Sequence, residues 1–209
     1  MPSRRPYNLR VRHSALVRVT HWLTAGSFIA LAVSGVAILL AHPRLYWGET
    51  GAVGTPSLID LPLPFLLTGQ SGWGRYLHFL SAWIAVLTGI AYVLGGMRKR
   101  HFRQNLFRPA RPAKYNLLQR ITYTAVVFVL FPLMIWTGLA MSPAVTSVVP
   151  MLVTSMGGQQ SARTIHFIVA SLLVLFVVGH VVMVVIAGFS RQVGAMILGG
   201  DVSAPQVQT

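Results

Sequence analysis

The chain has 209 residues, of which 54% are hydrophobic and only 10% are charged. Soluble domains carry about 25% charged residues, so this composition excludes an ordinary soluble protein and indicates an integral membrane protein. The formal net charge of +14 would also suit a nucleic-acid-binding protein, but the basic residues lie between apolar runs, which membrane topology explains better.

The chain begins with a basic segment, residues 1–22, that leads into a first apolar run. Leu23 to Ala41 contains no charged residue, and a membrane helix needs about 20 apolar residues. We therefore predict a membrane helix over about residues 20–41. The basic segment and the apolar run are both longer than in a typical signal peptide, so we interpret this helix as uncleaved.

A segment rich in proline and glycine, residues 42–74, comes next and contains two of the three acidic residues, Glu49 and Asp60. Its composition argues against another membrane helix and predicts a long external loop. Two interpretations of this loop stay open, a docking surface for another subunit and a lid over the adjacent end of the helices. A second membrane helix is expected over about residues 75–97, where Tyr76 to Met97 lacks Lys, Arg, Asp and Glu.

The second half of the chain predicts two further membrane helices, over about residues 117–141 and 163–189. Pro132 lies inside the first of these and is expected to bend it. Residues 191–209 are interpreted as a tail, and its end, "DVSAPQVQT", is typical of disorder.

The distribution of basic residues predicts the orientation, because cytoplasmic loops carry an excess of Lys and Arg. With both termini in the cytoplasm of a bacterium, only three of the 17 basic residues face outward: Arg44, Arg75 and Arg163. The other fourteen lie on the cytoplasmic side: Arg4, Arg5, Arg10, Arg12, Arg18, Arg98, Lys99, Arg100, Arg103, Arg108, Arg111, Lys114, Arg120 and Arg191. We therefore predict a multi-pass protein of the inner membrane.

Four histidines lie in the predicted membrane helices, namely His21, His78, His166 and His180. Ionisable side chains in such helices are costly and usually functional. The chain contains no cysteine, which excludes disulfides, cysteine-bound zinc, iron–sulfur clusters and covalently attached haem. A redox cofactor would therefore depend on other ligands, and histidine is the first candidate.

The positions of the four histidines predict two pairs at two depths. His166 and His180 are 14 residues apart in one helix, which separates them by about 21 Å and places them on one face. His21 enters its helix from the cytoplasmic side and His78 from the outer side. Depth thus pairs His21 with His180 and His78 with His166, and each pair suits the two axial positions of a haem iron.

An arginine precedes three of these histidines by three residues, in "RVTH", "RYLH" and "RTIH". Residues at this spacing are neighbours on a helix, and arginine pairs well with carboxylates such as haem propionates. Arg18 would serve the cytoplasmic haem, and Arg75 and Arg163 the outer one; interfacial anchoring is the alternative for all three. Small residues recur in the same helices, and Gly35, Gly89 and Gly138 would admit a porphyrin or a close helix neighbour.

The motifs "RVTHW", "GRYLHF", "TIHF" and "GHV" resemble the bacterial di-haem cytochrome b561 family, which includes the cytochrome b subunits of nickel–iron hydrogenases and formate dehydrogenases. The resemblance covers about residues 10–190. It implies an all-α, four-helix membrane bundle with two b-type haems and a quinone site beside the cytoplasmic haem. Asn116 and Gln119 are candidates for binding ubiquinone or menaquinone, and a polar helix start explains them equally well.

The resemblance also implies a function: electron transfer between a periplasmic partner, such as a molybdenum enzyme or a hydrogenase, and the membrane quinone pool. It leaves a homodimer open. The alternative is a stand-alone quinone oxidoreductase, for example one that oxidises superoxide. A transporter would need buried acids or an inverted repeat, and a non-haem metal enzyme would need three or more ligands at one depth. Cytochrome bc complexes carry two histidines on each of two helices, a pattern that this chain lacks.

Overall fold

The computed structural model describes residues 10–11, 13–51, 54–61, 71–98 and 117–201. Four helical segments are long and apolar enough to cross a membrane: Ala15–Ala41, Gly72–Arg98, Leu117–Ala140 and Gln159–Ile186. Large apolar side chains point outward along them, among them Ile29, Leu175 and Ile186. Such an exposed apolar surface suits contact with lipid, so the predicted all-helical membrane fold is confirmed.

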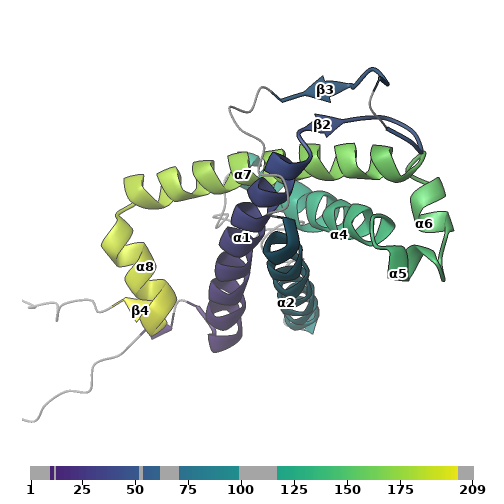
Figure 1. The fold of residues 1–209 in the computed structure, drawn as a ribbon. Helices are drawn as coiled ribbons and strands as arrows, with labels where there is room; N and C mark the ends of the chain where they lie inside the picture. The colour runs from purple at the N-terminus through teal and green to yellow at the C-terminus, as the bar shows by residue number, and fades with distance from the viewer. Residues whose placement is uncertain (1–9, 12, 52–53, 62–70, 99–116, 202–209) are drawn as a thin grey trace, which may run out of the picture.

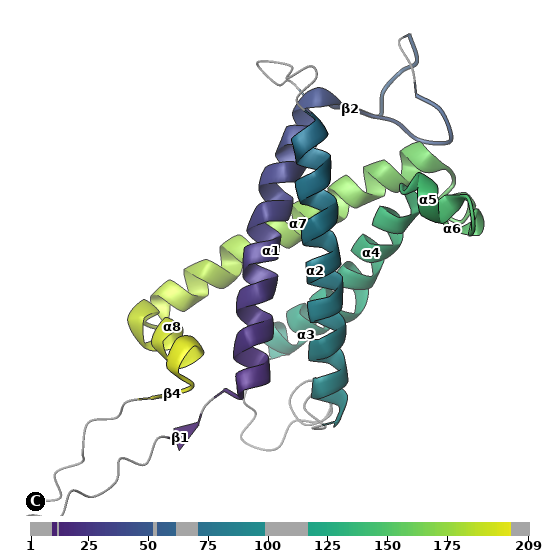
Figure 2. The same cartoon turned by 60° about the horizontal axis from the view of Figure 1, so that its bottom comes forward.

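The elements follow one another in a simple order (Figures 1 and 2). They are β1 (Arg10–Val11), α1 (Ala15–Ala41), β2 (Arg44–Leu45), β3 (Ile59–Asp60), α2 (Ser71–Arg98), α3 (Leu117–Ala125), the π-helix η2 (Val126–Leu130), α4 (Phe131–Ala140), α5 (Pro143–Thr146), α6 (Met151–Thr154), α7 (Gln159–Ile186), α8 (Phe189–Leu198) and β4 (Gly200–Asp201).

The membrane helices form two pairs. Helices α1 and α2 lie side by side along their lengths, and the continuous rod of α3, η2 and α4 lies beside α7 (Figure 2). The two pairs cross at an angle in both views (Figures 1 and 2). Val126, Val169 and Leu173 form a buried apolar cluster against which Phe28 of α1 packs, so this cluster connects the two pairs.

A wider turn precedes Pro132, the residue that is predicted to bend its helix. The proline lies in the first turn of α4, and the turn before it, Val126–Leu130, is a π-helix. Proline lacks a backbone N–H and its ring collides with the carbonyl one turn earlier, and a wider turn relieves both problems. The rod formed by α3, η2 and α4 therefore continues through the proline instead of ending at it.

The region after α7 differs from the expected tail. Helix α7 ends at Ile186, Gly188 adopts φ 96°, and a further helix, α8, runs over Phe189–Leu198. Gly188 is at the break because a side chain is strained at that φ. Strand β4 then pairs with β1, Arg10 opposite Asp201, which brings the two ends of the described chain together. Residues 202–209 of the predicted tail lie outside the described residues.

The external loop closes over the start of α7. The carbonyl oxygen of Gly48 accepts hydrogen bonds from the backbone N–H groups of Gln160 and Ser161, and the Thr164 hydroxyl donates to the carbonyl oxygen of Tyr46 at 2.6 Å. The first N–H groups of a helix have no partner within it, and here the loop supplies one. Strands β2 and β3 form a hairpin in the same loop, with Arg44 paired to Asp60 at 3.1 Å.

Candidate functional site

The structure brings the four membrane histidines together in two pairs. The ring centroids of His78 and His166 are 6.2 Å apart, and those of His21 and His180 are 6.3 Å apart. Helix α1 supplies His21, α2 supplies His78, and α7 supplies both partners. Each pair therefore joins one helix of the α1–α2 pair to α7, at the two depths that the spacing predicts.

The distance within each pair fits one metal ion between two imidazole rings. Imidazole nitrogens bind metals such as zinc at about 2.0–2.1 Å, and the ring centre lies about 1 Å behind the nitrogen, so two rings on opposite sides of one metal have centres about 6 Å apart. Both observed separations match this value. Among the described residues no group of three or more His, Cys, Asp or Glu side chains gathers, so the candidate ligands come in twos.

Hydroxyl groups contact both histidines of the outer pair, His78 and His166, which is named for the side that it is predicted to face. The Ser34 hydroxyl on α1 lies 2.9 Å from Nδ1 of His78, and the Thr137 hydroxyl on α4 lies 2.9 Å from Nδ1 of His166. Both hydroxyl-bearing side chains are fully buried. The sequence predicts a role for the glycines that follow these residues, Gly35 and Gly138, but none for Ser34 or Thr137 themselves.

Two of the three predicted glycines lie against the outer pair. A Cβ added to Gly35 would lie 3.7 Å from Cε1 of His78, and one added to Gly138 would lie 3.6 Å from Cε1 of His166. Each glycine backbone thus lies close to its histidine ring, and a Cβ there would make an ordinary van der Waals contact with the ring. Gly89 has no such neighbour, because a Cβ there would meet nothing within 4 Å.

The inner pair has aromatic neighbours. The Phe176 ring stacks on the His180 ring, with 6.0 Å between the ring centroids and 23° between the ring planes. Tyr123 of α3 contacts Phe176 edge-on. Trp22 lies edge-on to His21. No hydrogen bond joins the side chain of His21 or His180 to another described residue. The two pairs therefore have similar spacing and different surroundings, and the role of Phe176 was not predicted.

The three predicted arginines have different partners. Arg163 donates a hydrogen bond to the carbonyl oxygen of His42, the residue that caps α1. Arg75 is exposed on α2. Arg18 donates to the carbonyl oxygen of Ile197 at 2.6 Å, so it contacts the end of α8, while its Nε is buried without a partner.

His42 adds a titratable group to the outer end of the bundle. Its pKa is lowered, first by burial and then by the positive charges of Arg163 and Arg75. Both arginines are therefore close enough to the His42 imidazole for their charges to affect it. The outer end thus gathers positive charge where the sequence predicts acidic propionates.

A groove follows the rod of α3 and η2 on its side toward α7. Its volume is about 330 Å³, and its lining is apolar apart from Thr122: Ile121, Thr122, Ala125, Val126, Leu130, Leu172, Leu175 and Phe176. Phe176 lines the groove and also stacks on His180, so this ring separates the groove from the inner histidine pair. Gln119 is half-buried in the first turn of α3, and Asn116 lies outside the described residues.

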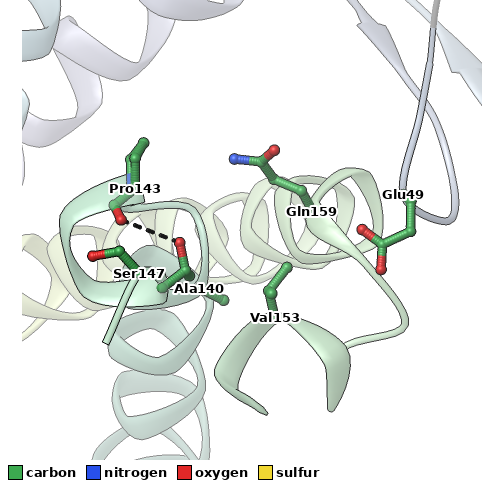
Figure 3. Close-up of a pocket in the computed structure, with 7 residues that line it drawn as sticks. Glu49, Ala140, Pro143, Ser147, Val153 and Gln159 are labelled. Carbon is green, nitrogen blue, oxygen red and sulfur yellow. Dashed lines mark hydrogen bonds between the residues drawn. The ribbon is translucent and has the colours of Figure 1, made fainter. Parts of the chain in front are cut away.

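A polar pocket of about 470 Å³ lies at the end of the bundle that is predicted to face outward (Figure 3). Figure 3 shows Glu49 and Gln159 on one side and Pro143 and Ser147 on the other. Ala140 in its lining follows Thr137 by about one turn of α4, and Gln159 precedes His166 by about two turns of α7. The pocket therefore lies on the outward side of the His78–His166 pair.

One comparison with known proteins identifies the family of this chain. The chain matches the family described as prokaryotic cytochrome b561 over residues 12–199. It is also similar to a protein of Azospira oryzae, provisionally named protein-methionine-sulfoxide reductase subunit YedZ1, with 29% identity over 211 residues that cover 90% of this chain and 96% of the relative. No solved structure matches the chain.

Proposed function

Because the chain belongs to the prokaryotic cytochrome b561 family, we propose that it is a membrane subunit that carries electrons between the quinone pool and a periplasmic reductase. Membership in the family makes the chain a membrane cytochrome with b-type haem and an electron-transport role, as the sequence predicts. The number of haems, their ligands, the quinone and the partner are the proposed parts.

The observation that carries this proposal is the pairing of the four histidines. We assign one haem to His78 and His166 and a second to His21 and His180, because each pair has the separation that one iron requires. When bound, each haem iron supplies a one-electron couple. The chain's own part is to present two neutral imidazoles at each depth, about 21 Å apart along α7.

Charge at the outer end supports propionate binding there. Arg75 and Arg163 both lie near His42, and no described ion pair uses either arginine. Their charges would offset those of two carboxylates. For Arg18 two roles are open, because its buried Nε is free while the rest of its guanidinium holds α8.

The apolar groove beside the inner pair supports a quinone site. A quinone ring is flat and largely apolar, and the groove offers apolar walls next to Phe176, which contacts His180. Thr122 is the polar group in its lining. Gln119 precedes the groove by less than one turn of α3, and Asn116 stays a prediction.

The partner is proposed from the relative's name and from the outer surface. The Azospira protein is named as a reductase subunit, and a reductase consumes electrons, so we assign the flow from quinol toward the outer face. The outer pocket with Glu49 and Gln159 lies nearest the outer pair and is the proposed contact surface for the catalytic subunit. A reductase of this kind agrees with the molybdenum enzyme of the sequence-based proposal in accepting electrons, whereas a hydrogenase partner would deliver electrons and reverse the flow.

The experiment that tests the haem assignment is a pyridine haemochrome assay on the purified protein. We expect two b-type haems per chain in the wild type and one in His78→Ala and in His21→Ala. His13→Gln is the matched control, because His13 lies before α1 and should leave both haems in place. A full complement of haem in His78→Ala would refute the outer ligand assignment.

The same preparation separates the two proposed roles. An electron-transfer subunit should take electrons from a quinol analogue until its haems are reduced and then stop. Continuous quinone reduction with superoxide, in the absence of any partner, would instead support the stand-alone oxidoreductase.

A further inference from the structure

We propose that Ser34 and Thr137 are positioning residues that fix the tautomer of the outer haem ligands and lower the reduction potential of the outer haem. Each hydroxyl oxygen accepts a hydrogen bond from the Nδ1–H group of one histidine, so the other ring nitrogen, Nε2, carries no proton and is free to bind iron. The inference rests on the proposed placement of the outer haem between His78 and His166.

The proton on each ring follows from counting hydrogens. A serine or threonine hydroxyl has one proton to donate and two lone pairs to accept with. The Ser34 hydroxyl lies 2.7 Å from the carbonyl oxygen of Ala30, and the Thr137 hydroxyl lies 2.9 Å from that of Leu133. A carbonyl oxygen carries no proton, so we infer that each hydroxyl donates its own proton to a backbone carbonyl. The carbonyl oxygens of Leu31, 3.2 Å from the Ser34 hydroxyl, and of Met134, 3.1 Å from the Thr137 hydroxyl, are second acceptors.

With its proton used, each hydroxyl can only accept from the histidine. The contacts of 2.9 Å between Ser34 and His78 and between Thr137 and His166 are therefore Nδ1–H donations to oxygen. This assignment comes from the hydrogen-bond network, since hydrogens are placed by inference. A neutral imidazole protonated at Nδ1 presents an unprotonated Nε2, which is the form that binds a metal.

The arrangement occurs twice in the same form. In the first pair of helices, Ser34 of α1 serves His78 of α2; in the second, Thr137 of α4 serves His166 of α7. Both hydroxyls are fully buried, so water does not compete for them. Each is followed by the glycine, Gly35 or Gly138, that lies against the same histidine ring.

When Nδ1–H donates a hydrogen bond, the imidazole becomes a more basic ligand at Nε2. A more basic ligand favours ferric over ferrous iron. Losing the acceptor should therefore raise the potential of the outer haem. The inner histidines have no such bond to another described residue, so the inner haem should keep its potential and acts as an internal reference.

The test is a redox titration of the purified protein, followed by visible spectra and by EPR of the ferric state. The variants Ser34→Ala and Thr137→Val remove the hydroxyl, and valine keeps the shape of threonine. We expect one midpoint to rise, corresponding to about a 3- to 10-fold change in the ferric-to-ferrous ratio at fixed potential. Tenfold equals 59 mV for a one-electron couple. The EPR signal of that haem should move, because its ligand rings are no longer held.

Three further variants separate positioning from simple packing. Ser34→Thr and Thr137→Ser keep the hydroxyl and should restore the wild-type midpoint. Ser171→Ala removes a hydroxyl that bonds back to the Phe167 carbonyl at 2.9 Å and contacts no histidine, so both midpoints should stay unchanged. Loss of the outer haem in Thr137→Val together with its retention in Thr137→Ser would also support a positioning role for the hydroxyl.

Wild-type midpoints in both Ser34→Ala and Thr137→Val, at full haem content, would overturn the inference. Loss of the outer haem in Thr137→Ser as well as in Thr137→Val would also overturn it, in favour of packing. Neither result would contradict the assignment of His78 and His166 as ligands of the outer haem. That assignment fails if His78→Ala keeps two haems. The two proposals therefore fail through different measurements.

Discussion

Arg18, Arg75 and Arg163 hold the same place in three copies of one sequence pattern, three residues before a histidine, yet their surroundings differ. Arg163 is bonded to the carbonyl oxygen at the end of α1, and Arg75 is exposed. Arg18 is bonded to the end of α8. The pattern thus predicts the level of each arginine in the membrane, and the contact that it makes depends on the neighbouring elements.

Arg18 provides a prediction at the level of one residue. In Arg18→Gln the hydrogen bond to the carbonyl oxygen of Ile197 is lost, and we expect the free energy of opening α8 to fall by about 1 kcal/mol. Hydrogen exchange of α8 amides measures this change. The control is Arg98→Gln, which removes a cation from the same predicted side of the membrane at the end of α2.

A different result would support the role predicted for Arg18 from the sequence, which is to pair with a propionate of the cytoplasmic haem. If it neutralises a propionate, Arg18→Gln should change the content or the midpoint of the inner haem while α8 exchanges as in the wild type. The buried Nε of Arg18, which has no partner, is the atom that such a propionate would use.

At the scale of the elements, the rod of α3, η2 and α4 is unusual because a π-helix lies at its centre. The π-helix, Val126–Leu130, supplies Val126 to the buried cluster and Leu130 to the groove wall. A wider turn rotates the side chains that follow it relative to an uninterrupted α-helix. The π-helix that accommodates Pro132 therefore contributes to both the buried cluster and the groove.

The groove gives a prediction for this element. Ala125→Trp places a large ring in the groove, so the rate of haem reduction by a quinol analogue should fall by about tenfold or more, while dithionite still reduces both haems. Stopped-flow absorbance measures the rate. Ala91→Trp, on an exposed face of α2, is the control and should reduce at the wild-type rate. Equal rates in the two variants would place the quinone elsewhere.

At the scale of the whole molecule, the pairing of β1 with β4 brings the described ends of the chain together beside α1 and α8. Four membrane helices return the chain to its starting side, in agreement with this contact. The orientation itself is proposed from the distribution of basic residues, because it depends on a membrane with two different sides.

The absence of native cysteine makes the orientation directly testable. We expect Ser155→Cys, exposed at the end of α6 on the side predicted to face outward, to react with a membrane-impermeant maleimide in intact cells. Ser190→Cys, on α8, should react only after the cells are opened. Both serines are exposed, so a lack of reaction would reflect the side of the membrane and not burial. The reverse labelling pattern would contradict the positive-inside assignment.

The membrane helices and the two histidine levels were predictable from the sequence because both depend on local properties. Hydropathy defines a membrane helix over about 20 neighbouring residues, and the helical rise places His166 and His180 at two depths. Family membership followed from the same four histidines and is confirmed by the match over residues 12–199. Hydropathy and the spacing of His166 and His180 each need only the residues of one helix, and the family pattern needs only the order of the four histidines in the sequence.

Only the tertiary structure decided which groups meet between helices. The bond of Ser34 to His78 joins residues 44 positions apart, and that of Arg18 to Ile197 joins residues 179 apart. Helix α8, the closure of the loop over α7 and the stacking of Phe176 on His180 likewise had no predicted role. The physical reason is that such contacts depend on how helices cross and rotate, which hydropathy and spacing within one helix do not determine.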